Sequence, residues 1–171
     1  CKLAGATVIG LTGSAEKCLW LVEELGYDIA INYKDVDWYE QLVDAAPERL
    51  DVIFDNVGGS ILDESLRLIG MHGVVLLCGS TSQYSEEEMS GPSNYIWLGT
   101  MRARMQGFVI FDYAERYPEA RAKMARWVRD GRLKIPSYEV AGDVDAFPEA
   151  FQQLYQGKNL GKMLLKLPAA T

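Results

Sequence analysis

The chain has 171 residues, about half of them apolar, and a formal net charge of −7. This composition suits one ordinary globular domain, so residues 1–171 are predicted to form a single domain, and the acidic balance argues against a sequence-independent grip on nucleic acid phosphates. No apolar run approaches the roughly 20 residues that cross a bilayer, and no segment has the pattern of a signal peptide, which predicts a soluble cytoplasmic protein without membrane contact.

Apolar runs separated by turn residues predict alternating strands and helices. A buried strand at residues 6–11 comes first, followed by a helix that Ser14 caps and Gly26 ends. The elements predicted after it are strands at 28–33, 52–54, 74–78, 105–110 and 161–167, helices at 38–46, 61–69, 118–129 and 147–155, a surface loop at 83–92 and an extended segment at 133–140. This alternation predicts an α/β fold with a doubly wound parallel sheet.

The cysteines and the histidine do not form a metal-binding pattern. Cys1, Cys18 and Cys78 are odd in number and far apart, without the paired spacing of a zinc site or of a disulfide framework. His72 is the sole histidine of the sequence and is predicted to be a surface turn residue. We therefore predict no metal site.

Two predicted strands end in small and polar residues, as strands do where they open onto a ligand crevice. The run 51–59 passes from apolar residues into Asn56, Gly58 and Gly59, whose side chains offer hydrogen bonds or leave the backbone accessible to a flat ligand. The strand at 74–78 likewise ends in glycine and serine. A plain turn after a core strand explains the same residues equally well.

The first strand ends at a place where a nucleotide-binding fold usually carries a carboxylate. Here the sequence has Gly13 and Ser14, with Lys17 in the next turn, and Tyr33 after the second strand could close the same pocket. A lysine without a neighbouring carboxylate favours binding of a phosphate group. Because NADP(H) carries a 2′-phosphate and NAD(H) does not, these residues favour NADP(H). The alternative is a solvated lysine in the first turn of a helix.

Several short motifs together resemble the zinc-independent medium-chain dehydrogenases/reductases. Within that family the chain is most similar to the prostaglandin reductase / leukotriene B4 dehydrogenase branch, which includes NADPH-dependent curcumin and alkenal reductases. The motifs that carry the resemblance lie at 13–17 (Gly-Ser-Ala-Glu-Lys), 24–28 (Glu-Leu-Gly-Tyr-Asp), 31–34 (Ile-Asn-Tyr-Lys), 54–59 (Phe-Asp-Asn-Val-Gly-Gly), 78–79 (Cys-Gly), 105–108 (Met-Gln-Gly-Phe) and 159–162 (Asn-Leu-Gly-Lys).

The resemblance implies a Rossmann-like domain that binds NADP(H) and an enzyme that reduces the carbon–carbon double bond of α,β-unsaturated ketones or aldehydes by hydride transfer. It places the 2′-phosphate contacts on Lys17 and Tyr33, and the nicotinamide-side contact on Asn56. The other cofactor-binding residues that we predict from the resemblance and from the strand ends are Gly13, Ser14, Val57, Gly58, Cys78, Gly79, Ser80, Tyr84, Phe108, Val109, Ile110 and Asn159.

Such a reaction needs a hydrogen-bond donor for the charge that develops on the carbonyl oxygen. Tyr84 is the candidate catalytic residue, although a tyrosine in a polar loop also suits a plain surface position. Similarly, Phe108, Val109 and Ile110 would be apolar in any core strand, and Asn159 would suit any turn.

The family's first strand and its glycine-rich phosphate turn have no counterpart in this sequence. We therefore expect a fragment of a longer reductase, with residues 133–171 returning toward an absent substrate-side domain, and we expect the isolated chain to bind NADPH weakly or not at all and to be inactive. The resemblance also implies a homodimer formed through the cofactor domain, for which residues 95–110 with an exposed Trp97 are the predicted edge.

Two other functions stay open at this stage. A non-enzymatic nucleotide-binding or scaffold domain would keep the fold without the chemistry. An S-adenosylmethionine-dependent methyltransferase would share the strand pattern, but it should carry an acid where this chain has Lys17 and Tyr33.

Overall fold

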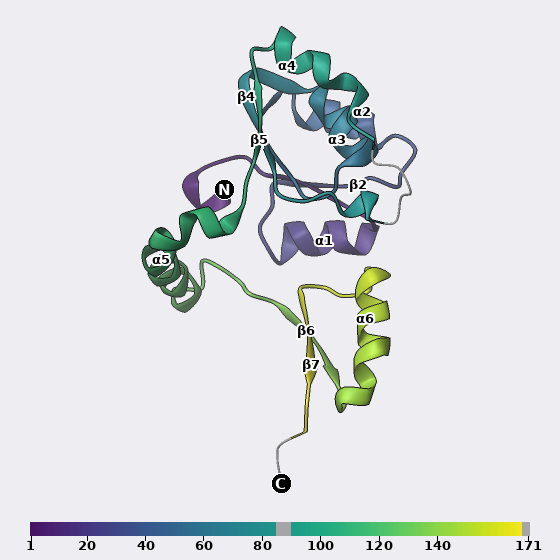
Figure 1. Cartoon of the computed structure of the whole chain (residues 1–171), viewed down its shortest axis with the longest axis vertical. Coiled ribbons are helices and arrows are strands. Elements are labelled where there is room, and N and C mark those ends of the chain that lie inside the picture. The colour runs from purple at the N-terminus through teal and green to yellow at the C-terminus, as the bar shows by residue number, and fades with distance from the viewer. Residues whose placement is uncertain (85–89, 169–171) are drawn as a thin grey trace. The chain divides into compact units, whose positions relative to one another are not determined.

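The computed structural model describes residues 1–84 and 90–168, and the chain divides into two compact units (Figure 1). The first unit contains Cys1–Lys34 and Pro118–Thr171, and the second contains Asp35–Tyr117. Every described strand pairs in parallel, with helices between consecutive strands, which confirms the α/β, Rossmann-like fold class. The single domain over 1–171 and the role of 133–171 stay predictions.

The first unit opens with a strand–helix–strand element. Strand β1 (Ile9–Thr12) pairs with β2 (Ile29–Asn32), and helix α1 (Ala15–Glu23) connects them. Ser14 caps α1 as predicted, because its hydroxyl oxygen accepts a hydrogen bond from the Lys17 amide at 3.2 Å. Gly10 lets α1 pack closely, since a Cβ there would lie 2.9 Å from the side chains of Leu21 and Tyr27.

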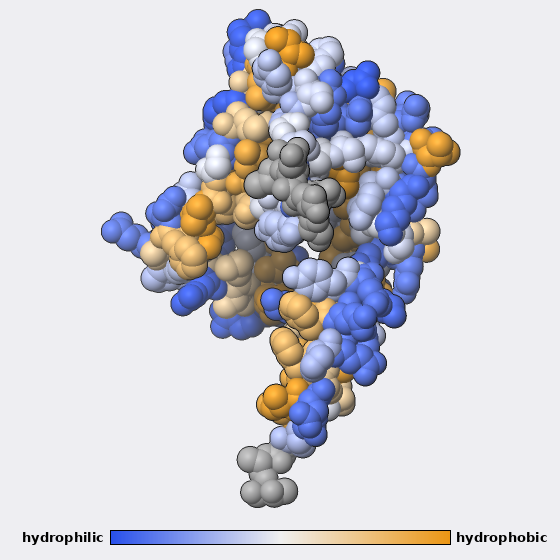
Figure 2. Space-filling view, turned by 45° about the vertical axis from the view of Figure 1, so that its right-hand side comes forward, coloured by the Kyte–Doolittle hydropathy of each residue, from blue (hydrophilic) through white to orange (hydrophobic). Residues whose placement is uncertain are grey.

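The same unit continues after the second one with helix α5 (Tyr117–Arg129), strand β6 (Ser137–Ala141), helix α6 (Phe147–Tyr155) and strand β7 (Lys162–Lys166). Strands β6 and β7 pair directly, and α6 lies alongside them (Figure 1). The bounds of α6 agree with the sequence prediction. Phe147 and Phe151 stack, Phe151 and Tyr155 meet edge to face, and all three are more than one-third exposed. Figure 2 shows both apolar and charged surface over these elements.

The second unit is a three-stranded sheet in the order β3-β4-β5. Its elements are helix α2 (Trp38–Ala45), strand β3 (Leu50–Asp55), helix α3 (Gly59–Leu66), strand β4 (Ile69–Leu77), helix α4 (Ile96–Thr100) and strand β5 (Arg104–Gly107). Short 3-10 turns lie at Lys2–Ala4, Thr81–Gln83, Ser93–Tyr95, Ile110–Arg116 and Val144–Ala146.

The core of the second unit lies between α3 and the sheet. Leu62 and Leu66 of α3 pack with Ile69 and Val75 of β4, and residues of α4 and β5 close the cluster. Burial of each of these aliphatic side chains stabilises the fold by about 1.5–3 kcal/mol. This packing fixes the sheet whose carboxyl edge carries the predicted nicotinamide-side residues.

Two sequence-based boundaries are wrong because sheet pairing overrides the apolar spacing. The helix predicted to extend to residue 69 ends at Leu66, and Ile69 instead begins β4 opposite Leu50. The register then shifts before Val52 and Val74. His72 lies in this irregular part of β4, exposed and with a φ of 61°, so it is a surface residue as expected but not in a turn that precedes the strand.

The strand predicted at 105–110 is also displaced, because β5 ends at Gly107. Trp97, predicted to be exposed, packs against the core cluster with the Arg49 guanidinium 5.3 Å from its ring centre.

Part of the loop predicted at 83–92, residues 85–89, lies outside the described residues. No helix in the described part of the chain is both long and apolar enough to cross a membrane.

Candidate functional site

The turn after β3 is built around a buried carboxylate. Asp55, the last residue of β3, is 5% exposed, and its Oδ1 accepts hydrogen bonds from the amides of Val57 at 3.1 Å and Gly58 at 3.0 Å. The Gly58 amide also lies 3.1 Å from Oδ2. Gly58 has a φ of 71° and precedes α3, so glycine suits this backbone conformation. The carboxylate therefore sets the shape of the turn that presents Asn56.

The segment after β4 is bound to this turn by backbone hydrogen bonds. The carbonyl oxygen of Asp55 accepts from the amides of Cys78 at 2.8 Å and Gly79 at 3.3 Å. The Asn56 carbonyl accepts from the Thr81 amide at 3.0 Å, and the Val57 carbonyl accepts from both the amide and the hydroxyl of Ser82. The two strand ends thus form one structure at the carboxyl edge of the sheet.

Small residues keep this edge open where the two strand ends meet. A Cβ at Gly79 would lie 3.2 Å from the Asn56 carbonyl oxygen and 3.6 Å from its side-chain oxygen, and a Cβ at Gly58 would lie 3.5 Å from Cβ of Ser80. Asn56 is exposed, and its side-chain amide forms no hydrogen bond with the described residues. The structure therefore brings together the predicted residues Asn56, Val57, Gly58, Cys78, Gly79 and Ser80.

Three predicted residues follow the neighbouring strand β5. The Phe108 amide donates to the Leu77 carbonyl at 3.0 Å, and its ring contacts the rings of Phe54 and Tyr113 at centroid distances of 6.5 and 5.3 Å. Val109 and Ile110 lie beyond the strand and are more than half exposed. Phe108 is thus part of an aromatic cluster, and the two residues after it belong to the segment that leaves the sheet.

Tyr84, the predicted catalytic residue, lies directly after the Thr81–Gln83 turn. Its side chain is 69% exposed and makes no hydrogen bond or ring contact with the rest of the described chain. The Thr81 and Ser82 amides of the preceding turn bind the Asn56 and Val57 carbonyls. The catalytic role of Tyr84 stays a prediction.

The predicted phosphate-binding residues lie in the first unit, at the carboxyl ends of β1 and β2. The Tyr33 hydroxyl lies over Gly13, where a Cβ would be 2.9 Å from its oxygen. Lys17 lies in the first turn of α1, where Ser14 caps its amide. In the structure as described, the Lys17 ammonium forms no ion pair, and it lies close to Gly157, at which a Cβ would be 3.4 Å from Nζ.

Asn159, also in the first unit, has a local partner. Its side-chain nitrogen donates to the Gly161 carbonyl at 2.7 Å, so it stabilises its own turn. Gly157, two residues earlier, lies close to the Lys17 ammonium. The structure is consistent with a turn residue here and leaves the predicted cofactor contact untested.

Asp55 is the residue that the sequence analysis did not assign to the site. An aspartate side chain often accepts hydrogen bonds from backbone amides two or three residues later and so forms a turn. The sequence Asp-Asn-Val-Gly could therefore have indicated this role for Asp55. The burial of the carboxylate, which makes its hydrogen bonds important, depends on tertiary packing.

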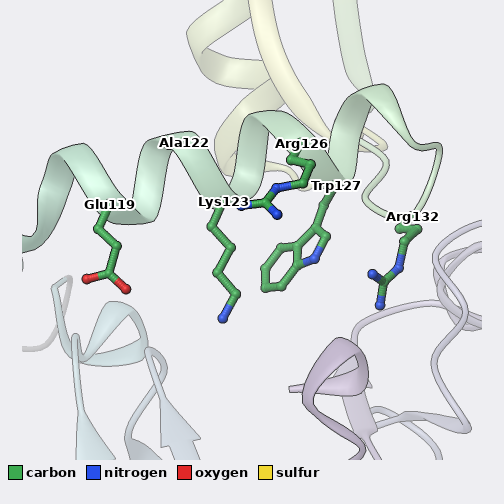
Figure 3. A pocket seen from close by; sticks show the side chains of 6 residues that line it. All are labelled: Glu119, Ala122, Lys123, Arg126, Trp127 and Arg132. Carbon is green, nitrogen blue, oxygen red and sulfur yellow. The ribbon is translucent and has the colours of Figure 1, made fainter.

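A surface cavity of about 290 Å³ lies along α5, and none of the predicted site residues lines it (Figure 3). Glu119, Lys123 and Trp127 project toward it from one side of the helix (Figure 3), and the Lys123 ammonium lies 5.0 Å from the Trp127 ring centre. Its remaining lining residues are Ala122, Arg126 and Arg132. Among the described residues, no group of three or more His, Cys, Asp or Glu side chains is arranged to bind a metal ion.

The family model and the related sequences that match this chain all describe dehydrogenases or reductases. The model of a family described as zinc-binding dehydrogenase matches residues 1–126. The NADPH-dependent curcumin reductase of Escherichia coli (strain K12) is 34% identical over 172 residues, which cover 97% of this chain and 50% of the reductase. The NADP(+)-dependent 2-alkenal reductase of Nicotiana tabacum is 36% identical over 169 residues, which cover 96% and 48%.

The solved structures agree with these relatives. The crystal structure of CurA from Vibrio vulnificus in complex with NADPH superimposes with a TM-score of 0.90 at 36% identity, and the match covers 99% of this chain and 52% of CurA. The chain spans about half the length of the curated relatives it matches. These matches confirm the resemblance to the medium-chain reductases, and the chain belongs to the zinc-binding dehydrogenase family.

Proposed function

We propose that this chain is the NADP(H)-binding part of an oxidoreductase that reduces the carbon–carbon double bond of α,β-unsaturated ketones and aldehydes without zinc. The observation that carries the proposal is the group at the end of β1, where the Tyr33 hydroxyl lies over Gly13 and Lys17 has no carboxylate partner among the described residues. Relatives described as NADPH-dependent curcumin reductase and 2-alkenal reductase support the same assignment.

The residues of the first unit fit the adenosine end of the cofactor. A 2′-phosphate carries close to two negative charges at neutral pH and accepts several hydrogen bonds. Lys17 supplies a cation, the Ser14 and Tyr33 hydroxyls can donate, and Gly13 leaves room beside them. A ribose hydroxyl without the phosphate would leave the Lys17 ammonium with no charge to neutralise, which favours NADPH over NADH.

The residues of the second unit fit the nicotinamide end. NADPH would supply the hydride, so the protein has to orient the ring and the substrate. The exposed Asn56 amide can hydrogen bond to polar groups of the cofactor, and the glycines at 58 and 79 allow close approach to the backbone. Phe108, Val109 and Ile110 would contact the nicotinamide amide through their backbones.

Tyr84 is the proposed donor to the substrate carbonyl oxygen. Its exposure of 69% leaves the hydroxyl available to a bound ligand. We expect Tyr84→Phe to lower kcat for an enone at least about tenfold with little change in NADPH affinity, because one donor to developing charge is removed. Steady-state kinetics of the full-length protein with cyclohexenone as substrate check this, and an unchanged kcat would remove Tyr84 from the mechanism.

Homodimerisation and a cytoplasmic location belong to the same proposal. Strand β5 lies at the edge of its sheet, and Tyr95 and Ile96, within the predicted segment 95–110, are more than 60% exposed, which leaves this segment available to a second copy. Light scattering coupled to size exclusion measures the mass directly. A monomer at micromolar concentration would contradict the dimer without affecting the cofactor assignment.

The direct test of the function is a calorimetric titration of the full-length protein with NADPH and NADH, repeated for Lys17→Ala. We expect the substitution to weaken NADPH binding about tenfold and to leave NADH binding nearly unchanged, since it removes one charge-assisted contact to the 2′-phosphate. Lys162→Ala, which removes an exposed lysine from β7, is the matched control. Equal affinities for the two cofactors would contradict the NADP(H) assignment, and tight NADPH binding without enone turnover would favour a non-enzymatic nucleotide-binding role.

A further inference from the structure

Lys34 lies in the same cluster as Tyr33 and Gly13. A Cβ placed on Gly13 would be 3.4 Å from Cε of Lys34 and 2.9 Å from the hydroxyl oxygen of Tyr33. The aliphatic part of Lys34 and the ring of Tyr33 therefore both lie over the same glycine.

This arrangement is unexpected for consecutive residues, because neighbours along a strand point to opposite faces. Strand β2 ends at Asn32, whose side-chain oxygen accepts a hydrogen bond from the Lys34 amide at 3.2 Å. Such a bond is an Asx turn, which breaks the alternation of the strand. The local sequence Asn-Tyr-Lys thus brings a hydroxyl and an ammonium-bearing side chain back to the end of β1.

The charges around Gly13 are unbalanced. Lys34 is exposed and, like Lys17, forms no ion pair in the portion of the chain that the structure describes. A phosphate monoester near neutral pH carries between one and two negative charges, so a single lysine would leave part of that charge uncompensated. Two lysines and the Tyr33 hydroxyl match a dianionic monoester more fully.

We propose that Lys34 is a second cation for the cofactor's 2′-phosphate and a determinant, together with Lys17, of the preference for NADPH. The inference rests on the proposed function and adds to it a residue that would contact the phosphate from the turn after β2. Lys34 acts on the phosphate alone, so binding of nucleotides without a 2′-phosphate does not depend on it.

The test uses 2′,5′-ADP and 5′-AMP as probes, which differ at the 2′ position. Each is titrated into the full-length protein by calorimetry at an ionic strength of about 0.05 M, where screening of exposed charges is weak. The variants are Lys34→Met, Lys34→Arg, Lys17→Ala and the control Lys162→Met. Lys34→Met keeps the apolar stem over Gly13 and removes the charge.

We expect Lys34→Met to weaken 2′,5′-ADP about three- to fivefold, as for a partly exposed ion pair, with 5′-AMP unchanged and Lys34→Arg close to the original protein. A Lys34→Met affinity equal to that of Lys162→Met, or equal losses for both nucleotides, overturns the inference. If Lys17→Ala removes the preference while Lys34→Met does not, the Lys34 inference alone falls. If the unchanged protein does not discriminate between the probes, the proposed function fails as well.

Discussion

Substitution of Asp55 should destabilise the second unit strongly. The carboxylate is 5% exposed and accepts hydrogen bonds from the amides of Val57 and Gly58. A hydrogen bond to a charged group contributes about 1.5–3 kcal/mol, and a buried donor left without a partner costs about 1–3 kcal/mol. Because the two bonds share one carboxylate, we expect Asp55→Ala to lower the free energy of unfolding by about 3 kcal/mol.

The assay is urea unfolding followed by far-ultraviolet circular dichroism, with the midpoint and the slope fitted separately. For a chain of this length, about 3 kcal/mol also corresponds to a fall in Tm of roughly 6–12 °C. Asp55→Asn retains an oxygen that can accept from both amides, so it should lose about half as much stability.

Asp51→Ala is the matched control, because Asp51 is exposed on the same strand and makes no hydrogen bond within the described residues. Its effect should stay within about 0.5 kcal/mol. If Asp55→Ala and Asp51→Ala shift the midpoint equally, the carboxylate does not hold the turn, and the account of how Asn56 is positioned is refuted.

Two further predictions concern the first unit. Gly161→Ala should destabilise by more than about 2 kcal/mol, because Gly161 has a φ of 90° and a Cβ there would lie 2.4 Å from the Pro136 carbonyl oxygen. Gly107→Ala, with nothing within 4 Å of the added atom, is the control, and equal unfolding midpoints would contradict the clash. The side-chain hydrogen bond from Lys2 is the main cause that lowers the pKa of Asp28, and a hydrogen bond from a backbone amide is the next. The stabilisation from the ionised Asp28 carboxylate is therefore present above the unfolded-state pKa. It is lost as the pH falls through the folded-state pKa. An NMR titration should place the Asp28 midpoint below 3.8 and show it rise in Lys2→Met, whereas a midpoint at or above 3.8 in the unchanged protein would contradict the contact.

The sequence by itself predicted the features that depend on neighbouring residues. Ser14 caps α1 as expected, Gly26 takes a φ of 73° close after that helix, and α6 has the predicted bounds. Caps, glycine turns and apolar periodicity act over a few residues, so they can be seen in the sequence alone. The alternation of strands and helices likewise predicted the α/β class.

The tertiary structure decided the features that depend on distant residues. Ile69 continued a helical pattern, but pairing with Leu50 makes it the start of a strand. Trp97 lies in a polar and aromatic stretch, yet it is held against the core beneath Arg49. In each case a contact between residues far apart in the sequence outweighs the local preference.

The candidate site divides in the same way. Its residue types at the strand ends could be predicted, because small and polar residues after a buried strand indicate an accessible edge. The burial of Asp55 and the return of Lys34 over Gly13 could not, since one needs the packed sheet and the other needs β1 and β2 side by side. The sequence shows which chemical groups follow each strand. The distances between groups on different strands are set only when those strands pair.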